Sequence, residues 1–305
     1  MRQIARMLVA LIVAGGFAAS SSGQMPRKQA APPRAPANAN AKVPSPADLA
    51  AERAEMDKLL GLWEQQSARL TSLVVSYKRV DKSPGWNEEI EYEGNAYLQT
   101  PSLACLHSKK NTAPPPKPGQ KPVSPTFVDH ERIVCTGKEV LQYDYASKEI
   151  FRFPLDKQAR KKALEEGPLP FLFNMKAEET KTRYSMSLHS QNAKAYLIAV
   201  LPRLDEDKEV FSRAFIQLNK QTFLPDRLML VSPNEKDTQD YRFNQVEANK
   251  TIDPKFFQAA LTIKGWKLID NPIPAQPARR NPADEPGRNS PARGAVGQRP
   301  GLPAR

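Results

Sequence analysis

The apolar positions change their spacing once along the chain, from a helical period to the alternation of strands. Between residues 48 and 70 apolar side chains recur at steps of three, four and seven residues, while charged side chains fill the other side. This spacing predicts an amphipathic helix with one face available for packing. Asp48, which follows Pro46, is expected at the N-cap or in the first turn. The apolar face consists of Leu49, Met56, Leu59, Leu60, Trp63 and Leu70.

From Leu73 onward apolar and polar residues mostly alternate, which predicts strands with one buried face. The stretch 195–202 is instead apolar at nearly every position, which suggests a strand covered on both sides. Residues 211–246 contain two turn signals, Asn219-Lys220 and Pro233-Asn234, and are interpreted as consecutive strands of a meander. The clearest alternating stretches are 73–77, 92–98 and 184–188.

Two segments interrupt the strands. Residues 155–184 contain a charged helical segment, a break at residues 167–170, an apolar burst and then a charged turn. Residues 251–261 offer Asp253 as an N-cap and Pro254 as the first helical position, so a short helix is expected before a last strand at 265–270. The pattern therefore predicts a mainly β (α+β) fold, with one long antiparallel sheet, a leading helix and a helical excursion near the middle.

The N-terminus has the pattern of an export signal. Two arginines precede an apolar run from Met7 to Ala19, and small residues follow it. We expect residues 1–23 to be a cleaved signal peptide, since the apolar run is shorter than the roughly 20 residues that an uncleaved membrane anchor needs. The mature protein is then soluble and periplasmic, or lies in another exported compartment.

The net charge of +12 resides mostly in the two ends of the chain. Residues 1–47 carry six basic residues and no acid, and residues 271–305 carry six arginines and two acids. The nearly balanced remainder lacks the basic face that nucleic-acid binding needs, so no nucleic-acid partner is expected. Residues 24–47 and 271–305 are rich in Pro, Ala and Arg and are predicted to be disordered. They are spacers or, alternatively, contact a membrane surface transiently. Residues 48–270 remain for one folded domain.

The stretch 129–145, DHERIVCTGKEVLQYDY, concentrates residues capable of chemistry. Alternation places Asp129, Glu131, Ile133 and Cys135 on one face and His130, Arg132 and Val134 on the other. The close Cys/His spacings of a zinc site are missing, so no metal site is predicted. Cys105 and Cys135 lie on two strands expected to be neighbours in an exported protein, which favours a disulfide; two buried thiols are the alternative.

No motif of catalysis or cofactor binding occurs in the sequence. The nucleophile elbow, the His-Glu-x-x-His pair, the phosphate-binding glycine loop and the dinucleotide fingerprint are all missing. His189 is expected to point into solvent from an amphipathic strand. We therefore predict no catalytic residues and no cofactor, and the protein is not expected to be an enzyme.

The apolar burst GPLPFLFNM, residues 167–175, has two readings. It is either ordinary core packing at a helix end, or a lid whose prolines present several large side chains together as a binding surface. In the second reading, the leading helix with Trp63 closes the other side of the same sheet. The candidate lid or cavity residues are Trp63, Leu169, Phe171, Leu172, Phe173 and Met175.

The order of these elements resembles the LolA/LolB-like superfamily of outer-membrane lipoprotein carriers. The most similar details are the glycine turn before VLQYDY, the strand break LPDRL, and the pattern N-x-x-I-D-x-x-x-F at residues 249–257 before a glycine-led final strand. The segments WEQQSARLTSL, ERIVCTGKEVLQYDY, GPLPFLFNMKAEE and AFIQLNKQTFLPDRL look more closely like an uncharacterised domain family of planctomycete bacteria. This closer resemblance covers nearly all of residues 50–270.

The resemblance implies a curved antiparallel half-open β-barrel, with helices covering a concave face that holds acyl chains. It also implies an arginine in the cavity, for which Arg79, Arg132 and Arg183 stay open as candidates. The function expected from it is a non-enzymatic, monomeric carrier that binds lipid or a lipidated protein. The alternative is an envelope sensor or protein-interaction module on the same fold.

Overall fold

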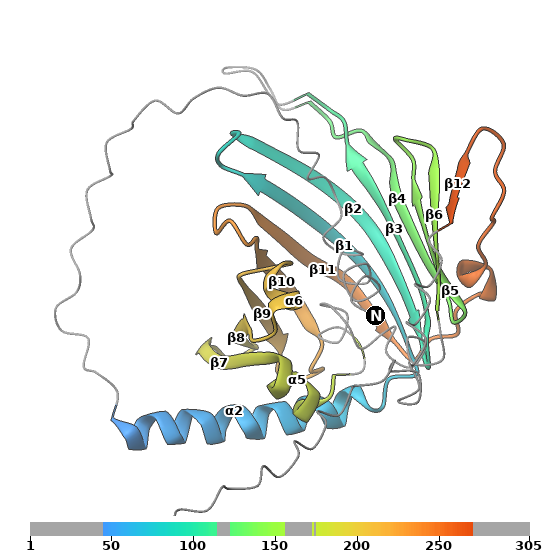
Figure 1. Cartoon of the computed structure of the whole chain (residues 1–305). Helices are drawn as coiled ribbons and strands as arrows, with labels where there is room; N and C mark the ends of the chain where they lie inside the picture. Colours follow the sequence, from blue (N-terminus) through green and yellow to red (C-terminus); the bar gives the residue numbers. More distant parts are fainter. Residues whose placement is uncertain (1–44, 115–122, 156–172, 174, 271–305) are drawn as a thin grey trace, which may run out of the picture. The chain divides into compact units, whose positions relative to one another are not determined.

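Strand alternation dominates the fold, as the sequence pattern predicts. The computed structural model describes residues 45–114, 123–155, 173 and 175–270, which all belong to one compact unit of the chain, residues 1–272. Its twelve strands form a single sheet in the order β12-β6-β5-β4-β3-β2-β1-β11-β10-β9-β8-β7 (Figure 1). The strands are β1 (Ser72–Ser83), β2 (Glu88–Gln99), β3 (Leu103–Asn111), β4 (Phe127–Thr136), β5 (Glu139–Asp144), β6 (Glu149–Pro154), β7 (Tyr184–Gln191), β8 (Ala195–Pro202), β9 (Arg213–Asn219), β10 (Pro225–Val231), β11 (Thr238–Ala248) and β12 (Lys267–Asp270).

The sheet is curved but not closed, because β7 and β12 form its two edges and do not pair with each other. Strands β1 to β6 and β7 to β11 each pair antiparallel in sequence order, and the antiparallel pair β1–β11 joins the two groups. The last strand, β12, differs by pairing parallel to β6. The predicted half-open antiparallel barrel is confirmed, with this one parallel pair at its edge.

Helix α2 (Pro46–Ser67) lies beside α5 (Ala177–Arg183) and β7, at the β7 end of the sheet (Figure 1). The helix begins two residues earlier and ends three residues earlier than the sequence predicts. Its buried side chains join one large apolar cluster with the inward-facing residues of the sheet. The predicted apolar face is thereby confirmed at Met56, Leu59, Leu60 and Trp63. Among the described helices, none combines the length and hydropathy of a membrane span.

Two short helices lie where the sequence pattern predicts no helix. Residues Ala177–Arg183 form α5 rather than a charged turn, and Asp205–Lys208 form the single turn α6. In α6, Asp207 is only 1% exposed and pairs with Arg183, which explains why an acidic run is held in a defined helix. Most of the excursion before α5 lies outside the described residues.

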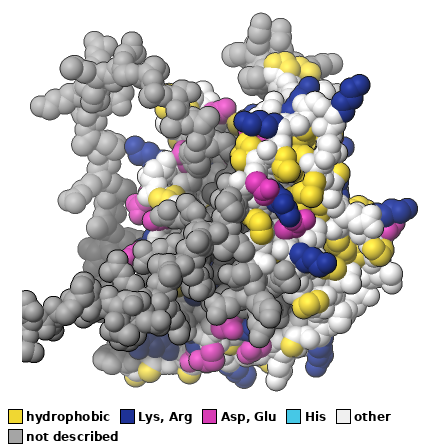
Figure 2. All heavy atoms as spheres, turned by 45° about the vertical axis from the view of Figure 1, so that its right-hand side comes forward, with side chains coloured by type: hydrophobic (Ala, Val, Ile, Leu, Met, Phe, Trp, Pro, Cys, Tyr) yellow, Lys and Arg dark blue, Asp and Glu magenta, His cyan; other side chains and the backbone are white. Residues whose placement is uncertain are grey.

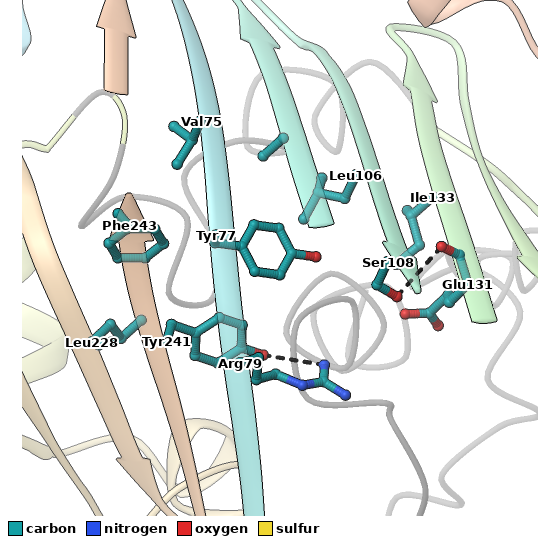
Figure 3. A pocket seen from close by; sticks show the side chains of 11 residues that line it. Val75, Tyr77, Arg79, Leu106, Ser108, Glu131, Ile133, Leu228, Tyr241 and Phe243 are labelled. Atoms are coloured by element: carbon teal, nitrogen blue, oxygen red, sulfur yellow. Dashed lines mark hydrogen bonds between the residues drawn. The ribbon is translucent and has the colours of Figure 1, made fainter. Parts of the chain in front are cut away.

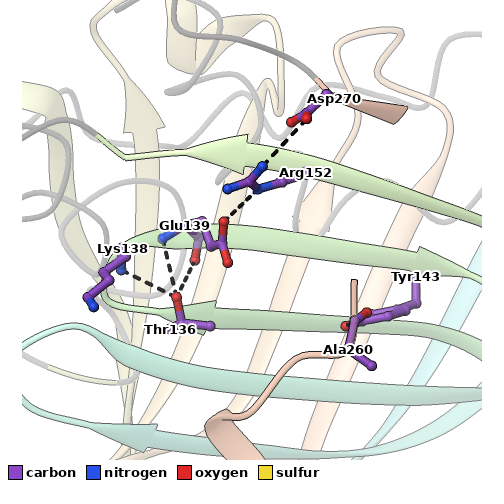
Figure 4. Close-up of polar contacts among 7 residues, drawn as sticks. All are labelled: Thr136, Lys138, Glu139, Tyr143, Arg152, Ala260 and Asp270. Atoms are coloured by element: carbon purple, nitrogen blue, oxygen red, sulfur yellow. Dashed lines mark hydrogen bonds and ion pairs between the residues drawn. The ribbon is translucent and has the colours of Figure 1, made fainter. Parts of the chain in front are cut away.

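A second, smaller apolar cluster lies on the convex face of the sheet. Its lining includes residues from β3, β4 and β5 and from the segment that follows β11. There Phe256 of the 3-10 helix η1 (Pro254–Phe257) stacks on Tyr97 with ring centroids 3.9 Å apart, and Tyr143 donates to the carbonyl of Ala260 at 2.9 Å (Figure 4). The predicted cap is confirmed, since the Asp253 side chain accepts from the Lys255 backbone N–H at 2.9 Å.

The turn between β4 and β5 follows the expectation from its sequence. Gly137 has a φ of +80°, a conformation that glycine adopts at low cost. The Thr136 hydroxyl accepts from the backbone N–H groups of Lys138 and Glu139, both at 3.3 Å (Figure 4). Arg152 of β6 pairs with Glu139 of β5 at 2.6 Å and with Asp270 of β12 at 3.5 Å. These pairs connect three strands near the edge of the sheet.

Charges of both signs are interspersed on the face of the molecule turned forward in Figure 2. Lys and Arg side chains lie beside Asp and Glu and are separated by hydrophobic side chains. This face carries no continuous basic surface among its described residues.

Candidate functional site

The concave face contains a small, partly open cavity between β1, β10 and β11 on one side and β2, β3 and β4 on the other. Apolar side chains make up most of its wall, and their strands project them inward because alternate residues share a face (Figure 3). The cavity volume is about 30 Å³, which is room for about one water molecule. The lining residues are Val75, Tyr77, Arg79, Ala96, Leu106, Ser108, Glu131, Ile133, Leu228, Tyr241 and Phe243.

A glycine gives one wall residue its place. The ring of Tyr77 lies over Gly94, its partner across β1 and β2. A Cβ atom at Gly94 would overlap this ring and would lie 2.6 Å from the carbonyl oxygen of His107. The lack of a side chain at Gly94 therefore lets Tyr77 lie flat along the sheet beside the cavity.

Arg79 brings a charge into this apolar wall. The residue is only 3% exposed, and its guanidinium carbon lies 3.9 Å from the centroid of the Tyr92 ring. Its Nη1 donates to the hydroxyl of Tyr241 at 3.4 Å (Figure 3). Its Nε lies 3.0 Å from Oδ1 of Asp81. A buried guanidinium needs such partners, because the loss of hydration is costly.

Burial and ion pairing have opposite effects on the pKa values of Arg79 and Asp81. Burial raises the pKa of Asp81 to about 6, although the nearby Arg79 guanidinium lowers it. For Arg79 burial alone would lower the pKa, but Tyr241 and Asp81 together hold it above its usual value. Arg79 is thus always charged, whereas Asp81 gains a proton in mildly acidic solution.

Glu131 is a second carboxyl group on the cavity wall. It is 9% exposed, and Gln142 donates to its Oε1 at 2.6 Å. Burial raises the pKa of Glu131 to about 7, against the lowering effects of Gln142 and Arg79. The charge of the cavity therefore depends on pH in the neutral range.

The tyrosines of the wall stay protonated. Burial raises the pKa of Tyr77 to about 12, and it raises the pKa of Tyr241 further above the usual value. Each ring thus presents a neutral hydroxyl, able to donate or accept a hydrogen bond, within an otherwise apolar surface.

Three of the predicted cavity or lid residues lie in the large apolar cluster, but they do not line this cavity. Trp63, Phe173 and Met175 are 2%, 1% and 1% exposed, and all three belong to the core that α2 shares with the sheet. The backbone N–H of Met175 donates to the hydroxyl of Ser67 at 2.8 Å, at the end of α2. The remaining predictions, Leu169, Phe171 and Leu172, lie outside the described residues.

The predicted disulfide between Cys105 and Cys135 is not formed in the structure. Both cysteines are free and buried. The register places Cys105 opposite Val134 and Cys135 opposite Ala104, so the strands are offset by one residue from the pairing that a disulfide needs. An offset of one residue places the two thiols on opposite faces: Cys135 belongs to the concave cluster and Cys105 to the convex one.

Two further residues, Asp129 and His130, lie on the opposite faces from those predicted, because β4 contains a bulge. Ser108 pairs with Glu131 but Lys109 pairs with Asp129, so His130 is the extra residue. Asp129 therefore meets His107 on the convex side, with Oδ1 and Nε2 3.0 Å apart, while the His130 ring lies 5.2 Å from that of Tyr92. The predicted common face of Glu131, Ile133 and Cys135 is confirmed.

The described part of the chain contains no cluster of three or more metal-ligating side chains. His189 is exposed, as the sequence predicts, and packs edge-on against Phe215.

Of the three arginines that the sequence leaves open for the cavity, Arg79 is the one that lines it. Arg132 lies on the convex face, where it donates to the carbonyls of Phe256 and Gln258 at 3.3 and 3.4 Å. Arg183 pairs with Asp207 outside the cavity. The alternation of residues 73, 75 and 77 continues to Arg79, so an arginine on the apolar face was the available signal. The alternation of Glu131 with Ile133 and Cys135 places this carboxyl on the same concave face, whereas the bulge at His130 moves only Asp129 and His130 from their predicted faces.

A comparison with protein families agrees with this fold. Residues 117–260 match the profile of the family described as outer membrane lipoprotein carrier protein LolA. No curated protein matches the chain in sequence.

Several solved structures are similar to the chain at low sequence identity. An uncharacterised conserved protein from Thermus thermophilus is 12% identical, over 71% of this chain and 99% of that protein, with a TM-score of 0.41. A LolA superfamily protein from Nitrosomonas europaea is 10% identical, over 66% and 96%, with a TM-score of 0.33. MucB in its complex with MucA from Pseudomonas aeruginosa is 12% identical, over 68% of this chain and 61% of that one, with a TM-score of 0.36.

The narrower resemblance to a planctomycete family stays a prediction. The matched segment begins between β3 and β4 in sequence and ends after η1, so it includes eight of the twelve strands of the sheet. The chain therefore carries a LolA-like domain.

Proposed function

We propose that the protein is a non-enzymatic, exported carrier that binds a lipid, or the acyl chains of a lipidated protein, on the concave face of its sheet. In this proposal residues 1–23 are removed on export, and residues 48–270 form the binding domain. Residues 24–47 and 271–305 are linkers that contact the membrane surface transiently. The protein acts as a soluble monomer in the periplasm.

The observation that carries this proposal is the apolar concave wall between β1, β2, β3, β4, β10 and β11. Residues such as Val75, Leu106 and Phe243 face one another there without filling the space between them. Each CH₂ group of an acyl chain transferred into such a surface contributes about 0.8 kcal/mol. The similarity of residues 117–260 to lipoprotein carriers supports the same reading.

The present cavity is too small for an acyl chain, so binding requires a movement. Helix α2 covers the concave cluster with Met56, Leu60 and Trp63, and it contacts only β7 and α5 among the described elements with several residues. We expect α2 to shift away from the sheet when a ligand enters. The lid expected at residues 169–175 stays a prediction.

The test is to purify the exported protein and analyse its organic extract by mass spectrometry, and then to titrate the delipidated protein with a fluorescent acyl probe. We expect co-purified lipid and saturable binding of the probe. The variant Ala96→Leu places extra carbon atoms in the cavity and is expected to weaken probe binding at least several-fold.

The matched control is Ala199→Leu, which makes the same change on the other face of the sheet, since its neighbours Ile198 and Val200 face the core. Melting curves of both variants separate a loss of binding from a loss of fold. A protein that carries no lipid and takes up no probe would contradict the carrier, and the sensor or protein-interaction module would then be the better reading.

A further inference from the structure

The cavity differs from a purely apolar binding surface because it contains one buried cation. Arg79 lies on the wall with Tyr92 against the face of its guanidinium and Tyr241 at one N–H group. A guanidinium carries five N–H donors in its plane, and a ring stacked on its face does not compete for these donors. The acceptor now nearest to Nε is the carboxylate of Asp81, at 3.0 Å.

Resting on the proposed carrier function, we infer that the ligand is an amphiphile with an anionic headgroup, a carboxylate or a phosphate. The headgroup pairs with the guanidinium of Arg79 in place of Asp81, while its acyl chains lie along Val75, Leu106 and Phe243.

An anionic headgroup suits this site because the present charged partner of Arg79 is itself an anion, the carboxylate of Asp81. Asp81 shows that a carboxylate fits against Nε of Arg79, and its side chain is 15% exposed, so it can turn outward when a ligand arrives. Phosphate and carboxylate oxygens accept two N–H bonds from one guanidinium, a geometry that a neutral glycerol or ester group does not offer. A buried charge on the wall of an apolar cavity thus selects the headgroup, and the wall binds the chains.

The charge of the cavity makes this selection depend on pH. With Arg79 positive and both Asp81 and Glu131 ionised, the three groups carry a net charge of −1, which repels an anion. Protonation of Glu131 makes the group neutral, and protonation of Asp81 leaves the charge of Arg79 uncompensated. Burial raises the pKa of these two carboxyls to about 7 and about 6 respectively.

The other ionisable groups around Arg79 either do not change their charge between pH 5.5 and 8 or, like the two carboxyls, make the site more positive as the pH falls. Tyr77, Tyr92 and Tyr241 are neutral because burial raises the pKa of each. Burial, together with Arg79 and Lys110, lowers the pKa of His130, so this ring gains a positive charge only in acid. The remaining charged neighbours are Lys110, Glu88 and Asp144. An anion at Arg79 favours the protonated carboxyls, so binding takes up protons and affinity rises as the pH falls.

The experiment compares two soluble lipids with identical chains, dioctanoyl phosphatidylglycerol and dioctanoylglycerol, on the full delipidated chain by calorimetric titration. The phosphate stays ionised over the range used, so the pH dependence belongs to the protein. We expect the anionic lipid to bind about tenfold or more tightly than the neutral one near pH 5.5. This preference should fall towards one near pH 8.

Three variants locate the effect. In Arg79→Gln the ratio of the two affinities should fall to about one at every pH. In Asp81→Asn the competing carboxylate is removed, so phosphatidylglycerol should bind about tenfold more tightly near pH 8 than it binds the unmodified protein. Arg183→Gln removes the arginine of an Arg–Asp pair outside the cavity and should leave the preference unchanged. Asp81→Asn keeps the test decisive if Arg79→Gln fails to fold.

Two further ligands show whether the site binds an anionic amphiphile or a free inorganic anion. Palmitate should compete with phosphatidylglycerol, and inorganic phosphate alone at millimolar concentration should not, because it lacks the chains. Competition by inorganic phosphate would overturn an amphiphile in favour of a free-anion site. Equal binding of both dioctanoyl lipids at every pH would overturn the headgroup inference and leave the carrier standing, whereas binding of neither would remove the carrier as well.

Discussion

At the scale of single residues, the site depends on where a side chain is missing and where a charge is present. Gly94 makes room for Tyr77, and the concave face around it is otherwise apolar. The exceptions are Arg79 and Glu131, which line the cavity, and Asp81, which pairs with Arg79. Buried charges of this kind rarely stabilise a fold more than apolar side chains of the same size would. We therefore relate the presence of Arg79 and Glu131 on the cavity wall to the proposed ligand binding rather than to stability.

The first prediction concerns the close contact at Gly94. In Gly94→Ala the new Cβ atom meets the ring of Tyr77 and the backbone of His107, so the ring must move into the cavity. We expect a loss of about 1–3 kcal/mol in the free energy of unfolding, measured by urea denaturation. Gly85→Ala, where no atom lies within 4 Å of the added Cβ, should change stability far less. Equal effects at the two positions would show that Tyr77 does not need the space.

The second prediction concerns the buried carboxyl of Glu131. Its folded pKa, about 7, lies above its usual value, so the neutral group contributes stability that is complete below about pH 4.5 and is lost as the pH rises through 7. The amide in Glu131→Gln cannot ionise. The variant should therefore gain stability relative to the unmodified protein as the pH rises from 4.5 to 7, by on the order of 3 kcal/mol.

Unfolding curves at several pH values measure this difference. The matched control is Glu178→Gln, whose side chain is 88% exposed and contributes no buried charge. The prediction is wrong if the difference in the free energy of unfolding between Glu131→Gln and the unmodified protein stays constant with pH. Glu131 would then titrate as it does in water.

At the scale of elements, the alternating pattern predicts the strands well and their local irregularities poorly. The apolar face of β1 and the turn at Gly137 follow from sequence because each depends on neighbours in the chain. The bulge at His130 and the offset of Cys105 from Cys135 depend on how two strands meet, which no single strand encodes. The helices α5 and α6 were missed because the Arg183–Asp207 pair that connects this region joins distant residues.

The third prediction concerns this pair. The carboxylate of Asp207 is 1% exposed and accepts from the guanidinium of Arg183, with Nε at 3.1 Å from Oδ2. Replacing Asp207 with Asn removes the charge that the partly buried guanidinium faces. We expect a loss of about 1–3 kcal/mol in stability. Asp205→Asn in the same helical turn alters a 95% exposed carboxylate and should cost less than about 0.5 kcal/mol. A similar loss of stability in both variants would show that the loss comes from changing α6 and not from breaking the Arg183–Asp207 pair.

The fourth prediction concerns α2. Gly61 lies within this helix, and a Cβ atom there would meet no atom within 4 Å. Since glycine loses more backbone entropy than alanine in a helix, Gly61→Ala should raise the free energy of unfolding by about 0.5–1 kcal/mol. If α2 must leave the sheet to admit a ligand, the same change should leave lipid affinity unaltered, because the helix stays folded as it moves. Thermal denaturation and the acyl-probe titration test the two parts separately.

At the scale of the whole domain, one sheet of twelve strands connects two apolar clusters that lie on its opposite faces. The concave cluster contains α2 and the cavity, and the convex cluster lies under η1. The strands β3, β4 and β5 contribute to both clusters, so neither cluster can be lost without disturbing the sheet between them. We therefore expect the described domain to unfold as one cooperative unit.

The two cysteines test this expectation, since each lies in one of the two clusters and is only 1% exposed. Denatured protein that has never met a reductant should take up two alkyl groups, because both thiols are free. In the native state neither should react, and with increasing urea both should become reactive along the same transition, followed by mass spectrometry of the peptides. Earlier labelling of Cys105 would show that the convex cluster under η1 opens while the cavity side stays folded. Failure of both to react in the denatured, unreduced protein would restore the disulfide that the sequence pattern favours.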